Sequence, residues 1–88
     1  MQGQEGPATL SQLVEQKLAG YFADQPDGIP PAGLYDRVLE DVERPLIQLT
    51  LAATRGNQVR AAEILGLNRN TLRKKIQDLG VEMARGRR

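Results

Sequence analysis

Apolar residues recur three and four positions apart along most of this chain, which is the spacing of one face of an α-helix. A first helix is predicted to begin near Thr9 or Ser11, since either residue can cap it. It should end before residues 24–33, a predicted loop with three prolines and two glycines. The apolar positions of this helix are Leu10, Leu13, Val14, Leu18, Tyr21 and Phe22.

A second, longer helix is predicted from about Leu34 to Arg55. Pro45 lies inside it, has no N–H for the carbonyl of Asp41, and crowds that turn with its ring. The helix therefore either kinks at Pro45 or divides there, with Pro45 in the first turn of the next helix. We favour the kink because the apolar spacing continues. One face carries Tyr35, Val38, Leu39, Val42, Leu46, Leu49 and Ala53, and the apolar surface is widened by Ile47 and Leu51.

Two short helices are predicted after the long one. Each short helix follows an asparagine that can cap it and ends at a glycine. A further glycine, before the first of these caps, can supply the left-handed residue that ends the long helix. The predicted segments are 58–65 and 69–79, with caps at Asn57 and Asn68 and glycines at Gly56, Gly66 and Gly80. No strand pattern or internal repeat is present, so we predict an all-α fold of four helices whose last two form a helix-turn-helix.

The wide apolar surface of the first two helices also bears on assembly. A chain of 88 residues buries only a modest core, so a second subunit is a source of further burial. An intramolecular core is the alternative, and the three aromatic residues, Tyr21, Phe22 and Tyr35, are interpreted as core. We expect 1–8 to be a flexible arm or linker, 9–55 dimerisation helices, 56–80 the helix-turn-helix and 81–88 a basic tail. The expected dimer contacts are Leu13, Leu18, Tyr21, Val38, Val42, Leu46 and Leu49.

Charge is distributed unevenly along the chain, although the net charge is only +1. Residues 1–54 contain three basic and eight acidic residues, whereas residues 55–88 contain nine basic and three acidic residues. Such a polarised chain indicates that its basic part faces a polyanion, with a solvated basic tail as the alternative.

Composition excludes several classes of site. The chain has no cysteine and no histidine, which removes disulfides, thiol catalysis and nearly every common zinc site, so no metal and no cofactor is expected. No apolar run of about 18 residues predicts a membrane span, and the first residues do not resemble a signal peptide. We therefore expect a cytoplasmic protein that is not an enzyme.

The last predicted helix has two different faces. At 100° per residue, Leu72, Ile76 and Leu79 form one apolar stripe, while Asn70, Lys74 and Gln77 lie opposite and Arg69 and Arg73 flank them. Arginine can bond bidentately to guanine and asparagine to adenine in the major groove of DNA. The predicted base contacts are Asn68, Arg69, Asn70 and Arg73. The predicted phosphate contacts are Arg55, Asn57, Gln58, Arg60, Thr71, Lys74 and Lys75. The alternatives are a solubilising surface for the run 73–75 and capping alone for Asn57 and Asn68.

Four segments resemble the Fis family of bacterial DNA-binding proteins. They are 33–39 (GLYDRVL), 42–46 (VERPL), 54–58 (TRGNQ) and 67–75 (LNRNTLRKK). Within that family, the chain is most similar to the C-terminal DNA-binding domain of nitrogen-regulation response regulators, the NtrC type, in its alphaproteobacterial form. The resemblance covers about residues 9–84 and is most specific in the last segment.

The resemblance implies a homodimer, held by the first two helices of each subunit, whose helix-turn-helix units enter successive major grooves of double-stranded DNA. It implies base contacts at Asn68 and Arg69. It also implies phosphate contacts at Asn57, Thr71, Arg73 and Lys74, which leaves both assignments open for Arg73. Two positions depart from the Fis protein itself: Val59 replaces a hydroxyl residue, and Asn70 replaces a glycine.

A complete NtrC-type activator would also carry a receiver domain and an ATPase domain that acts on RNA polymerase with the nitrogen-type sigma factor. The chain has no Walker-type phosphate loop and no acidic phosphorylation pocket. It is therefore expected to be either an excised domain, which the linker-like residues after Met1 favour, or a free-standing Fis-like protein. The rival hypotheses are an architectural protein that bends DNA with little sequence preference and a dimeric adaptor that binds an acidic protein.

Overall fold

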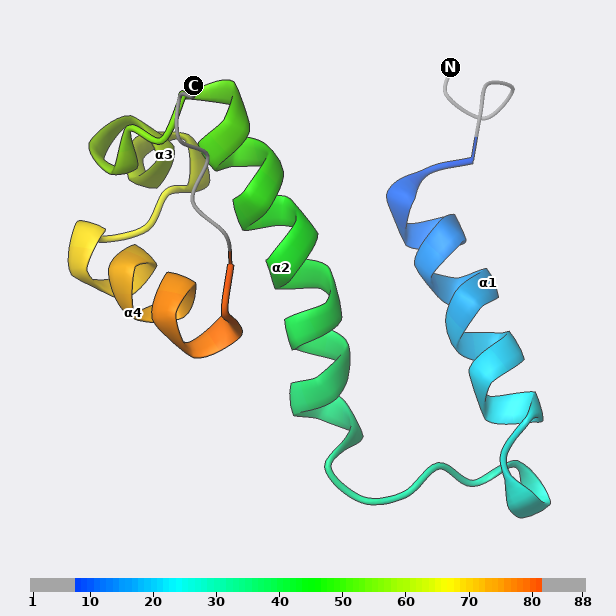
Figure 1. The fold of residues 1–88 in the computed structure, drawn as a ribbon. Coiled ribbons are helices and arrows are strands. Elements are labelled where there is room, and N and C mark those ends of the chain that lie inside the picture. Colours follow the sequence, from blue (N-terminus) through cyan, green and yellow to red (C-terminus); the bar gives the residue numbers. More distant parts are fainter. Residues whose placement is uncertain (1–7, 82–88) are drawn as a thin grey trace. The chain divides into compact units, whose positions relative to one another are not determined.

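The computed structural model describes residues 8–81, so the predicted arm and basic tail lie, apart from one residue each, outside the described residues. Within that range the elements are α1 (Leu10–Ala23), the short 3-10 helix η1 (Pro26–Gly28), α2 (Leu34–Ala53), α3 (Gln58–Leu65) and α4 (Arg69–Leu79) (Figure 1). The predicted all-α fold with four α-helices is confirmed. The chain divides into two compact units, Met1–Leu34 and Tyr35–Arg88, which are described in turn.

The first unit consists of α1 and the segment that follows it. Thr9 caps α1: its Oγ1 accepts a hydrogen bond from the Gln12 amide at 3.1 Å, and Gln12 Oε1 accepts one from the Thr9 amide at 2.8 Å. This reciprocal pair satisfies two amides that have no partner within the helix, which is why α1 begins here and not at Ser11. No residue of α1 is fully buried, so its apolar face remains largely uncovered within the unit.

In the second unit, α2 continues through Pro45 without a break. The alternative of two separate helices is therefore wrong. The helix ends at Ala53, two residues before the predicted end, because the turn that closes it includes Arg55.

The buried core of the second unit lies between the C-terminal half of α2 and the helix-turn-helix. Leu51 of α2, Ala61 of α3 and Leu72 of α4 are completely inaccessible. The small alanine side chains in the middle of α3 allow the other helices to approach closely. The remaining members of this core are Ile47, Ala62, Ile76, Leu79 and Val81.

Two separate apolar faces share α2. Ile47 and Leu51, predicted to widen one surface, belong to the core, whereas Leu39, Val42, Leu46 and Leu49 remain exposed. At 100° per residue, Leu49 lies about 160° from both Ile47 and Leu51 around the helix. The second apolar face is therefore not part of the core of the second unit. We call the four exposed residues the α2 stripe.

The prediction that the aromatic residues are core is wrong for Tyr35 and Phe22 within their own units. Tyr35 is 75% exposed and Phe22 is 38% exposed. Tyr35 precedes Ile47, the first fully buried residue of α2, by twelve positions, which places it about 18 Å from Ile47 along the helix. Tyr21 is half-buried and contacts Phe22 edge to face, with ring centroids 6.3 Å apart.

The left-handed conformation predicted for Gly56 after α2 is present, but Arg55 adopts it as well. Arg55 itself has a φ of 56°, and Gly56 follows with a φ of 81°. The Gly56 amide donates to the carbonyl of Leu51 at 2.8 Å, and the Arg55 amide donates to that of Ala52 at 3.2 Å. Arginine therefore occupies the left-handed position of this helix end, where glycine is usual.

Replacing Arg55 by glycine should raise the free energy of unfolding by about 0.5–1 kcal/mol, because the left-handed conformation is strained for a residue with a Cβ atom. Urea denaturation followed by circular dichroism measures the change. The matched control is Gly66→Arg at the equivalent position after α3, where φ is 74° and an added Cβ would meet no heavy atom within 4 Å. That variant should be destabilised by about 1 kcal/mol. Shifts of the same sign in both variants would contradict this explanation.

None of the helices between residues 8 and 81 combines the length and apolar character needed to cross a bilayer. Likewise, no group of three or more acidic side chains suited to hold a metal ion occurs among these residues.

Candidate nucleic-acid interface

The turn between α3 and α4 is fixed by backbone hydrogen bonds. Gly66 has a φ of 74°, and the Leu67 amide donates to the carbonyl of Ala62 at 2.9 Å. Leu67 is partly buried and packs against the core. The chain then turns directly into the cap of α4, so the start of α4 is held beside α3.

The apolar stripe of α4 is buried as predicted. Leu72 is inaccessible, and Ile76 and Leu79 are each 8% exposed. Because this face lies against the core, the opposite face of α4 is fixed toward solvent. The side chains exposed there include Arg69, Asn70, Arg73, Lys74 and Gln77. The helix therefore presents cations and amides on a surface that cannot rotate without opening the core.

Both predicted asparagine caps are present. Asn57 Oδ1 accepts a hydrogen bond from the Arg60 amide at 3.1 Å, and Asn68 Oδ1 accepts one from the Asn70 amide at 2.7 Å. Capping uses only part of the capacity of a carboxamide, which has a second lone pair on its oxygen and two N–H donors. The cap at Asn68 therefore orients the side chain and remains compatible with a further contact.

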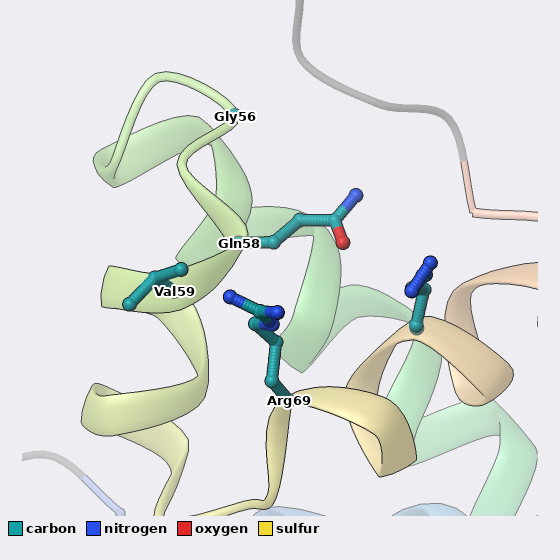
Figure 2. A pocket seen from close by; sticks show the side chains of 5 residues that line it. Gly56, Gln58, Val59 and Arg69 are labelled. Carbon is teal, nitrogen blue, oxygen red and sulfur yellow. The ribbon is translucent and has the colours of Figure 1, made fainter.

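An open groove of about 520 Å³ lies where the N-terminal ends of α3 and α4 meet. Figure 2 shows the Arg69 side chain reaching from α4 toward Gln58 and Val59 of α3. The other lining residues are Gly56 and Arg73. Unpaired amides at helix N-termini carry partial positive charge, and two guanidinium groups add to it. We call this feature the α3–α4 groove; its electrostatics favour an anionic ligand.

The predicted phosphate contacts are distributed over two regions of the surface. Arg55, Asn57 and Arg60 are exposed around the start of α3, where Gln58 is half-buried, and Thr71 and Lys74 are exposed on α4. Lys74 Nζ lies 3.6 Å from Asp78 Oδ2, with side chains 76% and 61% exposed. A pair this exposed contributes little and can open easily, so Lys74 remains available for another partner.

Lys75 differs from the other cations. Its Nζ lies 3.0 Å from Glu43 Oε2 of α2, and the two side chains are only 33% and 30% exposed. Lys75 follows Arg73 by two residues, so the two side chains leave α4 about 160° apart. The structure thus does not group Lys75 with the residues of the α3–α4 groove.

Glu43 and Arg44 were not identified as functional residues from the sequence. Arg44 Nε donates a hydrogen bond to the carbonyl oxygen of Leu79 at 3.1 Å, 35 residues later in the chain. Both residues belong to a helix with many charged positions, and no local spacing distinguishes them. Only the tertiary fold brings them to α4.

The sequence model described as "Bacterial regulatory protein, Fis family" matches residues 38–79, from the second turn of α2 to the end of α4. A putative Fis-like DNA-binding protein of Neisseria meningitidis is 47% identical over 72 residues, which are 82% of this chain and 90% of that protein. The DNA-binding protein Fis of Psychromonas ingrahamii is 47% identical over 79 residues, which are 90% of this chain and 79% of that protein.

The chain belongs to the Fis family. It is also similar to larger proteins that share this domain. The DNA-binding transcriptional regulator NtrC of Azospirillum brasilense is 65% identical over 77 residues, and that of Rhizobium meliloti is 58% identical over 83 residues. The matched region is only 16% and 17% of those proteins, so this Fis-family chain spans about a sixth of their length.

Proposed function

We propose that this chain binds double-stranded DNA sequence-specifically as a homodimer and is the C-terminal DNA-binding domain of an NtrC-type regulator of nitrogen metabolism. The observation that carries the proposal is the fixed polar face of α4. Its apolar stripe is anchored in the core, and its Arg69 and Arg73 line the groove beside α3. The identity of 65% to an NtrC protein favours this type of regulator over a Fis protein at 47%.

In this proposal α4 enters the major groove with its N-terminal end. Arg69 would donate two hydrogen bonds to the O6 and N7 atoms of a guanine. Asn68 and Asn70 would contact adenine, and Arg73 would reach either a base or a phosphate from the next turn of the helix. The proposed activity is DNA binding without catalysis, and it needs no cofactor.

Phosphate contacts would position the helix without reading sequence. Arg55, Asn57, Gln58 and Arg60 surround the start of α3, whose amides also suit a phosphate oxygen. Thr71 and Lys74 would contact the backbone from α4. Three of these residues are cations, Arg55, Arg60 and Lys74. A dimer would therefore neutralise about six phosphates and give a slope of about −5 in log K against log salt.

The α2 stripe supports the homodimer. Leu46 is 50% exposed and Leu49 is 70% exposed, although Ile47 and Leu51 of the same helix are buried. Val38 and the α1 residues Leu13, Leu18 and Tyr21 are the further proposed contacts; Leu13 is exposed and the other three are half-buried. A two-fold dimer would place two recognition helices about 34 Å apart, in successive major grooves. A shorter separation would require the DNA to bend, at a cost of about 1–6 kcal/mol.

Within a full-length regulator, the partners would be a receiver domain, an ATPase domain and RNA polymerase with the nitrogen-type sigma factor. Such a regulator would act in the bacterial cytoplasm, at the nucleoid. These assignments follow from the similarity to NtrC proteins, of which the chain covers a sixth.

A second candidate function is architectural DNA bending with little sequence preference. It is favoured because the chain aligns with 79% of the length of the Psychromonas Fis protein and with 90% of the length of the Neisseria Fis-like protein. An adaptor that binds an acidic protein is a rival of another class. Plain duplex DNA would fail to displace the partner of such an adaptor.

Selection of duplexes from a random pool, followed by affinity measurements at matched salt, tests the proposed function. The chain should prefer the selected two-fold symmetric duplex over a random-sequence duplex by about 10³-fold or more. Equal affinity for both duplexes would favour the architectural function. No binding to either duplex would contradict both.

A further inference from the structure

Two neighbouring residues of α2 contact α4 at two different levels. Glu43 Oε2 lies 3.0 Å from Lys75 Nζ near the middle of α4, and Arg44 Nε donates to the Leu79 carbonyl oxygen in its last turn at 3.1 Å. Glu43 and Arg44 precede the core residue Ile47 by four and three positions, so they lie on the core side of α2. We call these two contacts the α2–α4 strap.

The chemistry of the strap suits a structural connection. The last carbonyls of a helix have no intrahelical partner and carry the negative end of its dipole, so the guanidinium of Arg44 is a favourable donor there. The Glu43–Lys75 pair is about two-thirds buried, in contrast to the exposed Lys74–Asp78 pair. Solvent therefore screens it less, and it restricts how α4 tilts on α2.

We propose that Lys75 is a positioning residue and not a phosphate contact, and that the strap fixes the angle of α4 on α2 and thereby the separation of the two recognition helices in the dimer. This inference rests on the proposed function. Leu49 of the α2 stripe lies on the side of α2 opposite Ile47 and Leu51, whereas Glu43 and Arg44 lie on the core side. Leu39 of the stripe lines one pocket with Glu43, Lys75 and Leu79, so the stripe and the strap belong to neighbouring parts of α2. A change in tilt of α4 would therefore alter the distance between the recognition helices of the two subunits.

Glu43→Lys distinguishes a positioning role of Lys75 from direct DNA contact, because the two roles predict opposite changes in affinity for the selected duplex. The substitution breaks the ion pair, adds positive charge and frees Lys75. If Lys75 bound phosphate, affinity for the selected duplex would rise. If the strap positions α4, affinity should instead fall by about fivefold, the size of a typical coupling within an ion-pair network. The wild-type chain, measured beside it on the same duplex, shows whether the proposed function itself holds.

The salt dependence of binding, compared between Lys75→Gln and Lys74→Gln, gives a second readout that depends on phosphate contacts alone. Loss of one phosphate contact in each subunit should reduce the steepness of the salt dependence by about 2 for the dimer. Lys74→Gln should show this reduction, whereas Lys75→Gln should leave the slope unchanged. A reduced slope for Lys75→Gln would overturn the assignment.

The exchange variant Glu43→Lys with Lys75→Glu restores the pair with reversed polarity and covers the case in which a single variant does not fold. It should bind the selected duplex within about threefold of wild type, since the net charge is unchanged and only the partners are exchanged. An exchange variant that folds, as judged by circular dichroism, and still fails to bind would show that Lys75 contacts DNA directly.

Half-site spacing is the readout that a merely stabilising role would not change. The wild-type chain should lose affinity when one base pair is inserted at the centre of the selected duplex, because the recognition helices then lie out of register. Glu43→Lys, with a less restricted α4, should lose about fivefold less. Identical spacing preferences in the two proteins would overturn the proposal.

Discussion

Leu49→Asp should convert the dimer into monomers and lower its affinity for the selected two-fold symmetric duplex by about 100-fold or more. Leu49 is 70% exposed in the single chain, so the substitution removes no contact from its core. A carboxylate in an apolar interface would lose its hydration without gaining a partner. Each subunit would then bind its half-site alone. The dimer would lose the gain in affinity from two linked binding sites, which is about 10²-fold or more.

Sedimentation equilibrium measures the first effect, and a titration with the selected duplex measures the second. Gln48→Asp is the matched control, because it makes a comparable change in charge at an adjacent exposed position outside the α2 stripe. The control should remain dimeric. A Leu49→Asp chain that still sediments as a dimer, or the same dissociation in both variants, would show that the α2 stripe is not the interface.

Arg69→Ala should cost about 1–3 kcal/mol on the selected duplex and much less on a random-sequence duplex. Arg69 lies at the first position of α4 and lines the α3–α4 groove. In the proposed complex its guanidinium would form a bidentate contact with guanine, and a wrong base could not offer the same two acceptors. Binding to random DNA depends mainly on phosphate contacts and would change little.

Arg60→Ala serves as the control for this prediction, since Arg60 is an exposed cation of α3 outside the lining of the groove. Its loss should weaken binding to both duplexes by similar factors and reduce the steepness of the salt dependence. If Arg69→Ala behaved in the same way as Arg60→Ala, Arg69 would be a phosphate contact, and sequence would be read by other residues.

Local signals in the sequence were sufficient to predict the helix-turn-helix. The bounds of α3 and α4, their asparagine caps and the buried stripe of α4 all depend on residues within one or two turns of each other. Such patterns follow directly from helix geometry and from the hydrogen bonds that the helix ends require. The identity of the exposed residues on α4 then followed from its buried ones.

Long-range packing was not predictable in the same way. The apolar residues of α2 divide between a buried face and the exposed stripe, and spacing alone assigned Ile47 and Leu51 to a single wide surface. Lys75 belongs to a cationic run in the sequence, yet its closest ion-pair partner is Glu43, 32 positions earlier. Arg55 adopts a positive φ next to Gly56, the residue for which that conformation was expected.

In the proposed complex, the exposed face of α4 enters the major groove while its apolar face stays in the core. An NMR titration of the ¹⁵N-labelled chain with the selected duplex tests this arrangement. The amide signals of residues 68–74 should shift strongly, together with those of residues 57–60 at the start of α3, at one duplex per dimer. Unchanged signals from residues 68–74 at saturating duplex would contradict the proposed interface.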